Sequence, residues 1–230
     1  MTTLYFSGLK NDSASQILRY MDKSGFPGAL GLLINPVPIE PYDAHDLRRF
    51  NVAQEGDLKH AMEQVTHQMK LRPHDRFILF GTSRGAALAL QVANALSEDD
   101  IKRVAFTVCE GVFDTAPAVM ESRFGALVTK TLTWFLPKVT EYNPYHVQTP
   151  LWIAEHFKQP HHPVLMVTSQ QDTVVPMEHT QRVFDAMHPT ATCRRLLVLI
   201  KSPHSSYATW DHTDRCLYKQ VMQEWVNKYV

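Results

Sequence analysis

The sequence is poor in cysteine, has no excess of charge of either sign and contains no long apolar run. Its 3 cysteines, Cys109, Cys193 and Cys216, are far apart and form no C-x-x-C pair. This spacing argues against both a disulfide framework and a zinc site. The 23 Lys and Arg residues balance 23 Asp and Glu residues, so we do not expect a protein that binds nucleic acid through its phosphates.

Two further absences concern membranes and export. The apolar runs fall far short of the roughly 20 residues that a membrane-spanning helix needs. Residues 1–13 contain no basic segment followed by a long apolar core, so a secretory signal is not expected. These observations predict a globular protein of the cytoplasm with no membrane span.

Short apolar runs alternate with longer amphipathic stretches along the whole chain. The runs predicted as strands are 3–6, 29–34, 76–80, 104–108, 164–168 and 196–200. The stretches predicted as helices are 15–21, 58–71, 86–96, 178–187 and 213–229. Strands that alternate with helices form a mostly parallel sheet with helices on both faces. The pattern therefore predicts a single α/β domain over residues 1–230.

Two segments do not fit a minimal alternation. Residues 36–57 are rich in proline and are predicted as a loop, long enough to indicate either a function or an unrecognised element. Residues 115–159 carry one or two helices with several aromatic side chains, interrupted by Pro137, Pro144 and Pro150. We interpret this second segment as a cap-like insertion over the sheet edge rather than as a separate domain.

A G-x-S-x-G pattern, Gly81-Thr82-Ser83-Arg84-Gly85, lies between a predicted strand and a predicted helix. A nucleophile on such a tight turn has a strained backbone and close neighbours, and the two glycines remove side chains that would collide. The turn would place the Ser83 hydroxyl at a helix N-terminus, where the dipole favours developing negative charge. A turn that uses small residues only for packing is the alternative.

The residues downstream of Ser83 favour the catalytic interpretation. A serine nucleophile needs a general base, and the base needs an orienting carboxylate. Asp172 follows the fifth predicted strand and His204 follows the sixth. All three side chains would lie at the carboxyl edge of the sheet, where open α/β sheets hold their sites. Glu110 and Asp114 follow the fourth predicted strand and are alternative positions for the acid.

With its nucleophile, acid and histidine in this order, the sequence resembles the α/β-hydrolase family over nearly its whole length. The resemblance rests on the turn around Ser83, on the D-x-V-V-P segment that begins at Asp172, and on His204. The D-x-V-V-P flank, frequent around the acid of this family, favours Asp172 over the alternative acids. The resemblance implies the α/β-hydrolase fold, with residues 115–159 as a short helical insertion after the family's sixth strand.

The resemblance also implies an oxyanion hole made of two backbone amides. One would belong to Arg84, and the other would come from the loop after the first strand. The family often has His-Gly in that loop, where this chain has Ser7-Gly8-Leu9, so Leu9 is the candidate. Because the donor is a backbone amide, the missing histidine does not remove the function. The Arg84 side chain would either contact a substrate carboxylate or form a structural salt bridge.

The chemistry that the resemblance implies is cleavage of carboxylic esters or thioesters through an acyl-enzyme on Ser83, without a metal or an organic cofactor. The aromatic and aliphatic side chains of the insertion point to a small, partly apolar acyl substrate. Leu127, Trp134 and Trp152 are the candidates for lining its pocket. The alternatives are a peptidase or acyltransferase with the same triad, and a non-catalytic member that binds a ligand or a partner.

Overall fold

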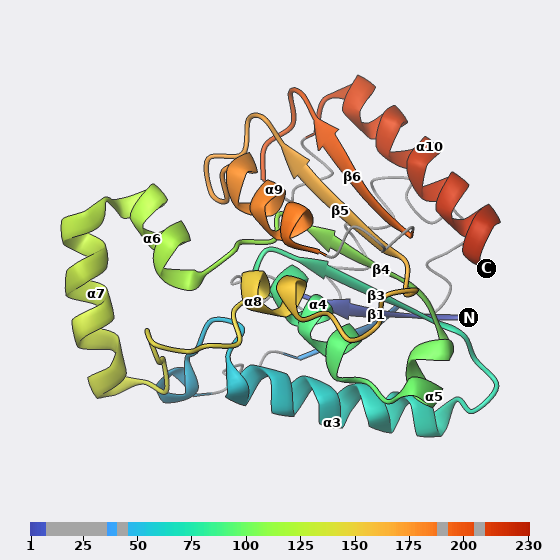
Figure 1. Ribbon diagram of the computed structural model, residues 1–230, viewed down its shortest axis with the longest axis horizontal. Helices are drawn as coiled ribbons and strands as arrows, with labels where there is room; N and C mark the ends of the chain where they lie inside the picture. Colours follow the sequence, from blue (N-terminus) through green and yellow to red (C-terminus); the bar gives the residue numbers. More distant parts are fainter. Residues whose placement is uncertain (8–35, 41–45, 188–192, 205–209) are drawn as a thin grey trace.

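The computed structural model describes residues 1–7, 36–40, 46–187, 193–204 and 210–230 (Figure 1). The strands are β1 (Thr2–Phe6), β2 (Pro36–Ile39), β3 (Phe77–Thr82), β4 (Val104–Glu110), β5 (Val164–Ser169) and β6 (Arg194–Leu199). The helices are α3 (Glu55–Leu71), α4 (Arg84–Ala95), α5 (Glu98–Lys102), α6 (Ala116–Phe124), α7 (Ala126–Val139), α8 (Pro150–Glu155), α9 (Met177–Ala186) and α10 (His212–Tyr229), with a 3-10 turn η1 (Leu47–Arg49). The strand predicted over 29–34, the helix predicted over 15–21 and Leu9 lie outside the described residues.

The described strands form one parallel sheet in the order β2-β1-β3-β4-β5-β6. Every neighbouring pair of strands runs in the same direction, so the carboxyl ends of all of them lie at one edge of the sheet. The prediction of an α/β fold with a mostly parallel sheet is therefore confirmed. This edge is where β3 turns into α4 and where the loops after β5 and β6 begin.

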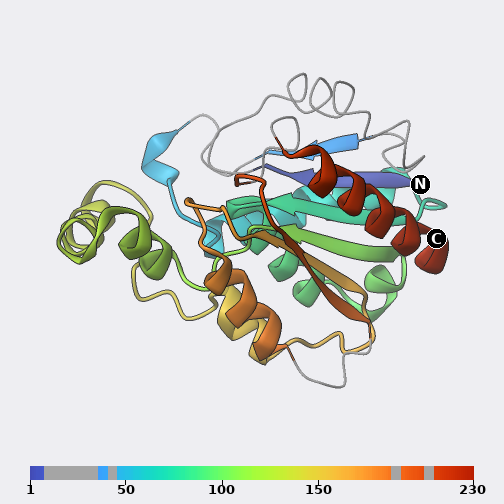
Figure 2. The same ribbon diagram turned by 90° about the horizontal axis from the view of Figure 1, so that it is seen from above.

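Successive residues of the central strands are buried on opposite faces of the sheet, because side chains alternate along a strand. On one face, Leu79 and Met166 belong to apolar clusters with α3, α4, α8 and α9. On the other face, Phe80 and Val167 pack in a cluster with Trp225 of α10. Figure 2 shows α10 on one side of the sheet and α4 and α9 on the other. Both faces are thus covered by helices, as the apolar runs predict.

The proline-rich segment 36–57 is not a loop throughout: of the two possibilities that its length indicated, the structure shows an unrecognised element. Residues Pro36–Ile39 form strand β2, which pairs with β1 alone among the described strands. A proline has no amide hydrogen to donate, so a strand that contains it is tolerated at the edge of a sheet. The segment then forms the turn η1 and enters α3 at Glu55.

The segment 115–159 divides into two parts with different surroundings. Helices α6 and α7 form a hairpin that projects from the body on the side of the carboxyl edge of the sheet (Figures 1 and 2). Helix α8 instead packs between α4 and α9 in the helical layer. The hairpin exposes large apolar side chains, including Leu127 at 80% and Trp134 at 64%. Within the described ranges, no helix is both long and apolar enough to cross a bilayer.

Candidate active site

Ser83 occupies the sharp turn between β3 and α4. Its backbone has φ 55° and ψ −120°, and Ala53 is the only other non-glycine residue with a positive φ in the described part of the chain. Such a conformation is costly for a residue with a side chain and clusters at functional sites. The Ser83 amide donates to the Glu110 carbonyl at 2.8 Å, which ties the turn to the end of β4.

Both glycines of the G-x-S-x-G pattern are required by backbone contacts. A Cβ on Gly81 would lie well under 3.0 Å from the carbonyl oxygen of Gly85. A Cβ on Gly85 would collide in the same way with the carbonyl oxygens of Phe6 and Ser7. The start of α4 therefore rests directly against the end of β1, as the steric argument from the sequence requires.

Asp172 and His204 form a hydrogen-bonded pair at the same sheet edge as Ser83. The Asp172 Oδ2 atom accepts from Nδ1 of His204 at 2.5 Å. Its Oδ1 atom accepts from the amides of Val174 and Val175 at 2.9 and 2.8 Å. Because Nδ1 is the donor, Nε2 of the neutral imidazole is left as an acceptor. That Nε2 atom is buried and has no hydrogen-bond partner within the described residues.

The alternative acid Asp114 is engaged elsewhere. Its carboxylate accepts from Nδ1 of His179 at 2.6 Å and from Nε of Arg182 at 2.7 Å. Burial opposes its ionisation, yet the hydrogen bonds from His179, the Thr115 amide and Arg182 prevail and lower the pKa of Asp114. The other alternative, Glu110, accepts a hydrogen bond from the Tyr218 hydroxyl. Of the three candidate acids, Asp172 is the one that the structure pairs with His204.

A second Ser-His-Asp arrangement, which the sequence did not reveal, is built around Asp114. The Ser122 hydroxyl lies 2.9 Å from Nε2 of His179, whose Nδ1 contacts Asp114. Ser122 is an exposed residue within helix α6, and its hydroxyl also donates to the Ala118 carbonyl at 3.0 Å. It has neither the strained turn nor the helix N-terminus of Ser83. These contacts instead tie the hairpin to α9.

The side chain of Arg84 forms a structural salt bridge, one of the two alternatives that the sequence leaves open. Its Nε and Nη2 atoms donate to the Asp57 carboxylate at 2.9 and 2.5 Å. The side chains are only 4% and 0% exposed. The Arg84 amide is the first of α4, and such amides have no acceptor within their own helix. No pattern in the sequence identifies Asp57 as the partner of the Arg84 side chain.

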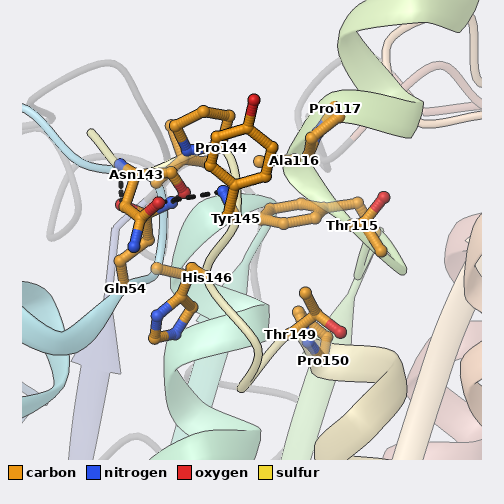
Figure 3. A pocket seen from close by; sticks show the side chains of 13 residues that line it. Gln54, Thr115, Ala116, Pro117, Asn143, Pro144, Tyr145, His146, Thr149 and Pro150 are labelled. Atoms are coloured by element: carbon orange, nitrogen blue, oxygen red, sulfur yellow. Dashed lines mark hydrogen bonds between the residues drawn. The ribbon is translucent and has the colours of Figure 1, made fainter. Parts of the chain in front are cut away.

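A cavity of about 230 Å³ lies between the start of α3, the loop after β4 and the segment before α8 (Figure 3). It is lined by Val52, Ala53, Gln54, Phe113, Thr115, Ala116, Pro117, Asn143, Pro144, Tyr145, His146, Thr149 and Pro150. The Ala53 amide donates to the Asp57 carboxylate that binds Arg84. The cavity wall is thus linked by hydrogen bonds to the residue that follows Ser83.

One wall of this cavity is held by a pair of reciprocal hydrogen bonds. The Gln54 side chain donates to the Asn143 carbonyl at 2.6 Å and accepts from the Asn143 amide at 2.7 Å. Figure 3 shows this pair and His146 on one side of the cavity, facing Thr115 and Ala116 on the other. Two segments far apart in the sequence are thereby fastened together.

The predicted substrate-binding residues are not among those that line this cavity. Leu127 and Trp134 lie on the exposed surface of the hairpin. Trp152 stacks on the His156 ring with centroids 4.3 Å apart and packs against the core. The sequence reasoning missed the lining residues because they come from three separate segments, which only the folded chain brings together.

The model of the prolyl oligopeptidase family matches residues 49–230. The chain belongs to the prolyl oligopeptidase family. This is a family of serine hydrolases with the α/β-hydrolase fold, so the resemblance to α/β-hydrolases is confirmed. A comparison with curated protein sequences finds no match.

Solved structures share the fold of this member of the prolyl oligopeptidase family at low sequence identity. A hormone-sensitive lipase from a metagenome library gives a TM-score of 0.68 at 14% identity, covering 100% of this chain and 78% of that one. An esterase of Pyrococcus furiosus gives a TM-score of 0.62 at 12% identity, and the match covers 99% of this chain and 83% of that one. An acylaminoacyl peptidase of Pyrococcus horikoshii gives a TM-score of 0.63 at 15% identity, and the match covers 85% of this chain and 32% of that one. At these identities the likeness establishes the fold alone.

Proposed function

We propose that this member of the prolyl oligopeptidase family hydrolyses carboxylic esters or thioesters through an acyl-enzyme on Ser83. The observation that supports this most is the Asp172–His204 pair at the same sheet edge as the strained Ser83 turn. The pair leaves Nε2 of His204 as a buried acceptor, which is the atom that a general base must offer.

In the proposed reaction, Nε2 of His204 takes the proton from the Ser83 hydroxyl as its oxygen attacks the substrate carbonyl. Asp172 holds the imidazole in the required tautomer and stabilises the imidazolium that forms. The proton then passes to the leaving group, the acyl-enzyme forms, and water attacks it by the reverse sequence of proton transfers. No metal or organic cofactor is needed for these steps.

The oxyanion would be stabilised by backbone amides. The Arg84 amide lies in the first turn of α4, where the helix dipole also favours negative charge. Leu9 remains the proposed second donor. Each donor of this kind contributes about 3 kcal/mol to stabilising the transition state in other acyl-transfer enzymes.

A covalent probe tests this function directly. We expect a fluorophosphonate to label the protein and the adduct to map to Ser83, because the probe phosphonylates a serine that a neighbouring base activates. The measurement is peptide mass spectrometry after proteolysis. Absence of labelling, under conditions that label an ordinary esterase, would exclude the catalytic function and favour a non-catalytic binding protein.

The cavity is proposed to bind the acyl group. Its volume and its apolar residues Val52, Ala53 and Phe113 suit a short, partly apolar chain. Replacing Ala116, in the cavity wall, with leucine is therefore expected to lower kcat/KM for butyryl esters about tenfold relative to acetyl esters. The leucine side chain would fill the space for the two additional methylene groups of the butyryl chain, and burying each of them contributes about 0.8 kcal/mol to binding. The measurement is the ratio of kcat/KM for the two p-nitrophenyl esters.

Ala126→Leu is the matched control for this substitution. Ala126 begins α7 as Ala116 begins α6, but its side chain is exposed and does not line the cavity. Equal selectivity changes in the two variants would mean that the acyl group binds elsewhere. A panel of esters, thioesters and N-acylated peptides, tested on the unmodified enzyme, separates hydrolysis of esters from peptidase activity.

A further inference from the structure

The hairpin of α6 and α7 carries an apolar surface that the proposed reaction does not use. Its large exposed apolar side chains, which we call the hairpin surface, are Phe124, Leu127, Val128, Trp134, Phe135 and Val139. All of them lie within one turn of the chain from the end of α6 to the end of α7. A gathering of exposed apolar side chains on one element is typical of a site that meets a partner or a membrane.

The two sides of α7 have different surroundings. On the inward side, Thr129 is buried and Leu136 packs against the apolar cluster of α4, α8 and α9. On the other side, Leu127, Trp134 and Lys138 follow one another at spacings of seven and four residues, so they lie in line along the helix. The high exposure of Leu127 and Trp134 means that the described residues leave this side of α7 open to solvent.

The charges on this part of the hairpin are all positive. Residues 122–140 include Arg123, Lys130 and Lys138, all of them exposed, and contain no Asp or Glu. The whole chain, in contrast, has 23 basic and 23 acidic residues. The Nζ atom of Lys138 lies 3.1 Å from the centre of the Trp134 ring. The hairpin surface therefore combines aromatic and aliphatic side chains with a local excess of positive charge.

We propose that the hairpin surface docks on an anionic lipid bilayer, with α7 lying in the headgroup region. Helices that bind at the surface of a bilayer present Trp, Phe and Leu side chains together with Lys and Arg, as α7 does. The apolar side chains enter the outer part of the bilayer, and the basic side chains are attracted to the negative headgroups. A Trp ring and a long basic side chain in contact, such as Trp134 and Lys138, both suit the headgroup level.

A second copy of the chain suits this surface less well than a lipid bilayer. In a dimer with two-fold symmetry through α7, the lysines of one copy would face the lysines of the other. Helix α7 has no acidic residue that could pair with Lys130 or Lys138 across such an interface. A bilayer supplies the opposite charge. Its fluid surface also adapts to a hairpin that projects from the body (Figure 1), whereas a protein partner would need a groove of matching shape.

Docking in this way also bears on the cavity of the proposed site. Thr115, Ala116 and Pro117, at the start of the hairpin, form one wall of that cavity (Figure 3). A hairpin that rests on a bilayer would therefore hold the cavity close to the lipid surface, where apolar esters gather. This consequence for the substrate rests on the proposed function, whereas the docking itself does not depend on Ser83.

Co-sedimentation of the full chain with vesicles tests the docking without reference to turnover. We expect the protein to sediment with vesicles of equimolar phosphatidylcholine and phosphatidylglycerol. It should bind vesicles of phosphatidylcholine alone about a hundredfold more weakly, because each of the basic side chains contributes about fivefold near an anionic surface. Added salt should weaken the binding to the anionic vesicles, since it screens this attraction.

Matched substitutions locate the lipid contact. Leu127→Ser combined with Trp134→Ser should lower the affinity for the anionic vesicles about tenfold or more, because less apolar area enters the bilayer. Leu71→Ser is the control, since Leu71 is 60% exposed but lies at the end of α3. Lys130→Gln should lower the affinity about fivefold, and Lys70→Gln, on the exposed side of α3, should leave it unchanged. A melting curve checks that each variant is folded.

Tryptophan fluorescence gives a second readout at the hairpin surface. Trp134 is 64% exposed, whereas Trp210 and Trp225 are buried and Trp152 is half-buried. Anionic vesicles should shift the emission to shorter wavelength, because the Trp134 ring leaves water. Trp134→Phe should lose this shift and still sediment with the vesicles, since phenylalanine keeps an apolar ring at the position.

Several outcomes would overturn the proposal. They are a wild type that does not sediment with the anionic vesicles, an equal loss of binding in Leu71→Ser and in the double variant, and an emission shift that persists in Trp134→Phe. A wild type that ignores vesicles but forms a dimer, which the double variant dissociates, would make the hairpin surface an interface between copies. If Ser83 is not labelled by the fluorophosphonate while vesicle binding holds, the proposed function fails and the docking stands.

Discussion

Ser83→Ala is expected to lower kcat for short acyl esters by about 10⁴-fold or more, with little change in melting temperature. The substitution removes the attacking oxygen and leaves binding and the oxyanion donors in place, which supply only a small residual rate. Stability should be retained because alanine keeps the Cβ, so the strained backbone is neither relieved nor worsened. The measurement is p-nitrophenyl ester turnover together with a thermal melt.

The other two members of the proposed triad should behave as parts of one unit. His204→Ala should lose about as much activity as Ser83→Ala, and the double variant should lose no more than either. Ser122→Ala is the informative control, because Ser122 contacts His179 as a nucleophile would contact its base. If Ser122→Ala abolished turnover and Ser83→Ala retained it, the nucleophile would have been misassigned.

Asp57→Ala is expected to destabilise the protein by about 3–5 kcal/mol, because it removes the carboxylate that accepts two hydrogen bonds from the buried Arg84 guanidinium. For a domain of this size, that loss lowers the melting temperature by about 10 °C. The Asp57 carboxylate also accepts from the Ala53 amide, so its removal loosens the cavity wall as well. Thermal unfolding followed by circular dichroism measures the effect.

Two controls identify the cause of that loss. The exposed Asp99–Lys102 pair provides a matched aspartate-to-alanine substitution. Asp99→Ala should lower the free energy of unfolding far less than Asp57→Ala, because water screens the charges of this pair. Replacing Arg84 with methionine in the Asp57→Ala background should restore part of the stability, since it removes the buried positive charge that the Asp57 carboxylate had balanced. An equal loss in Asp99→Ala and Asp57→Ala would contradict this account of the salt bridge.

The strands of the sheet's centre could be predicted from the sequence because each is an apolar run bounded by polar or small residues. The position of Ser83, Asp172 and His204 at one edge then followed from parallel pairing alone. Strand β2 was missed because two of its residues are prolines, which a loop also favours, and its place at the edge depends on the rest of the sheet.

The features that sequence reasoning missed depend on contacts between distant segments. The cavity draws on residues before α3, after β4 and before α8, and no local pattern joins them. The partner of Arg84 was one acid among 23. Burial of Glu110 beneath α10 raises the pKa of its carboxyl group, and this burial depends on a contact with a helix more than 100 residues further along the chain.

The contact between the end of β1 and Gly85 shows that the folded unit is larger than the region that matches the family. The likeness begins at residue 49, yet β1 lies inside the sheet between β2 and β3. The carbonyl groups of Phe6, its last residue, and of Ser7, which follows it, form the surface on which the turn around Ser83 rests. A boundary drawn at residue 49 would therefore remove a strand inside the sheet, leave the backbone of β3 unpaired along one side and leave the turn unsupported. The first few residues of the chain are structurally as much a part of the proposed active site as the G-x-S-x-G motif itself.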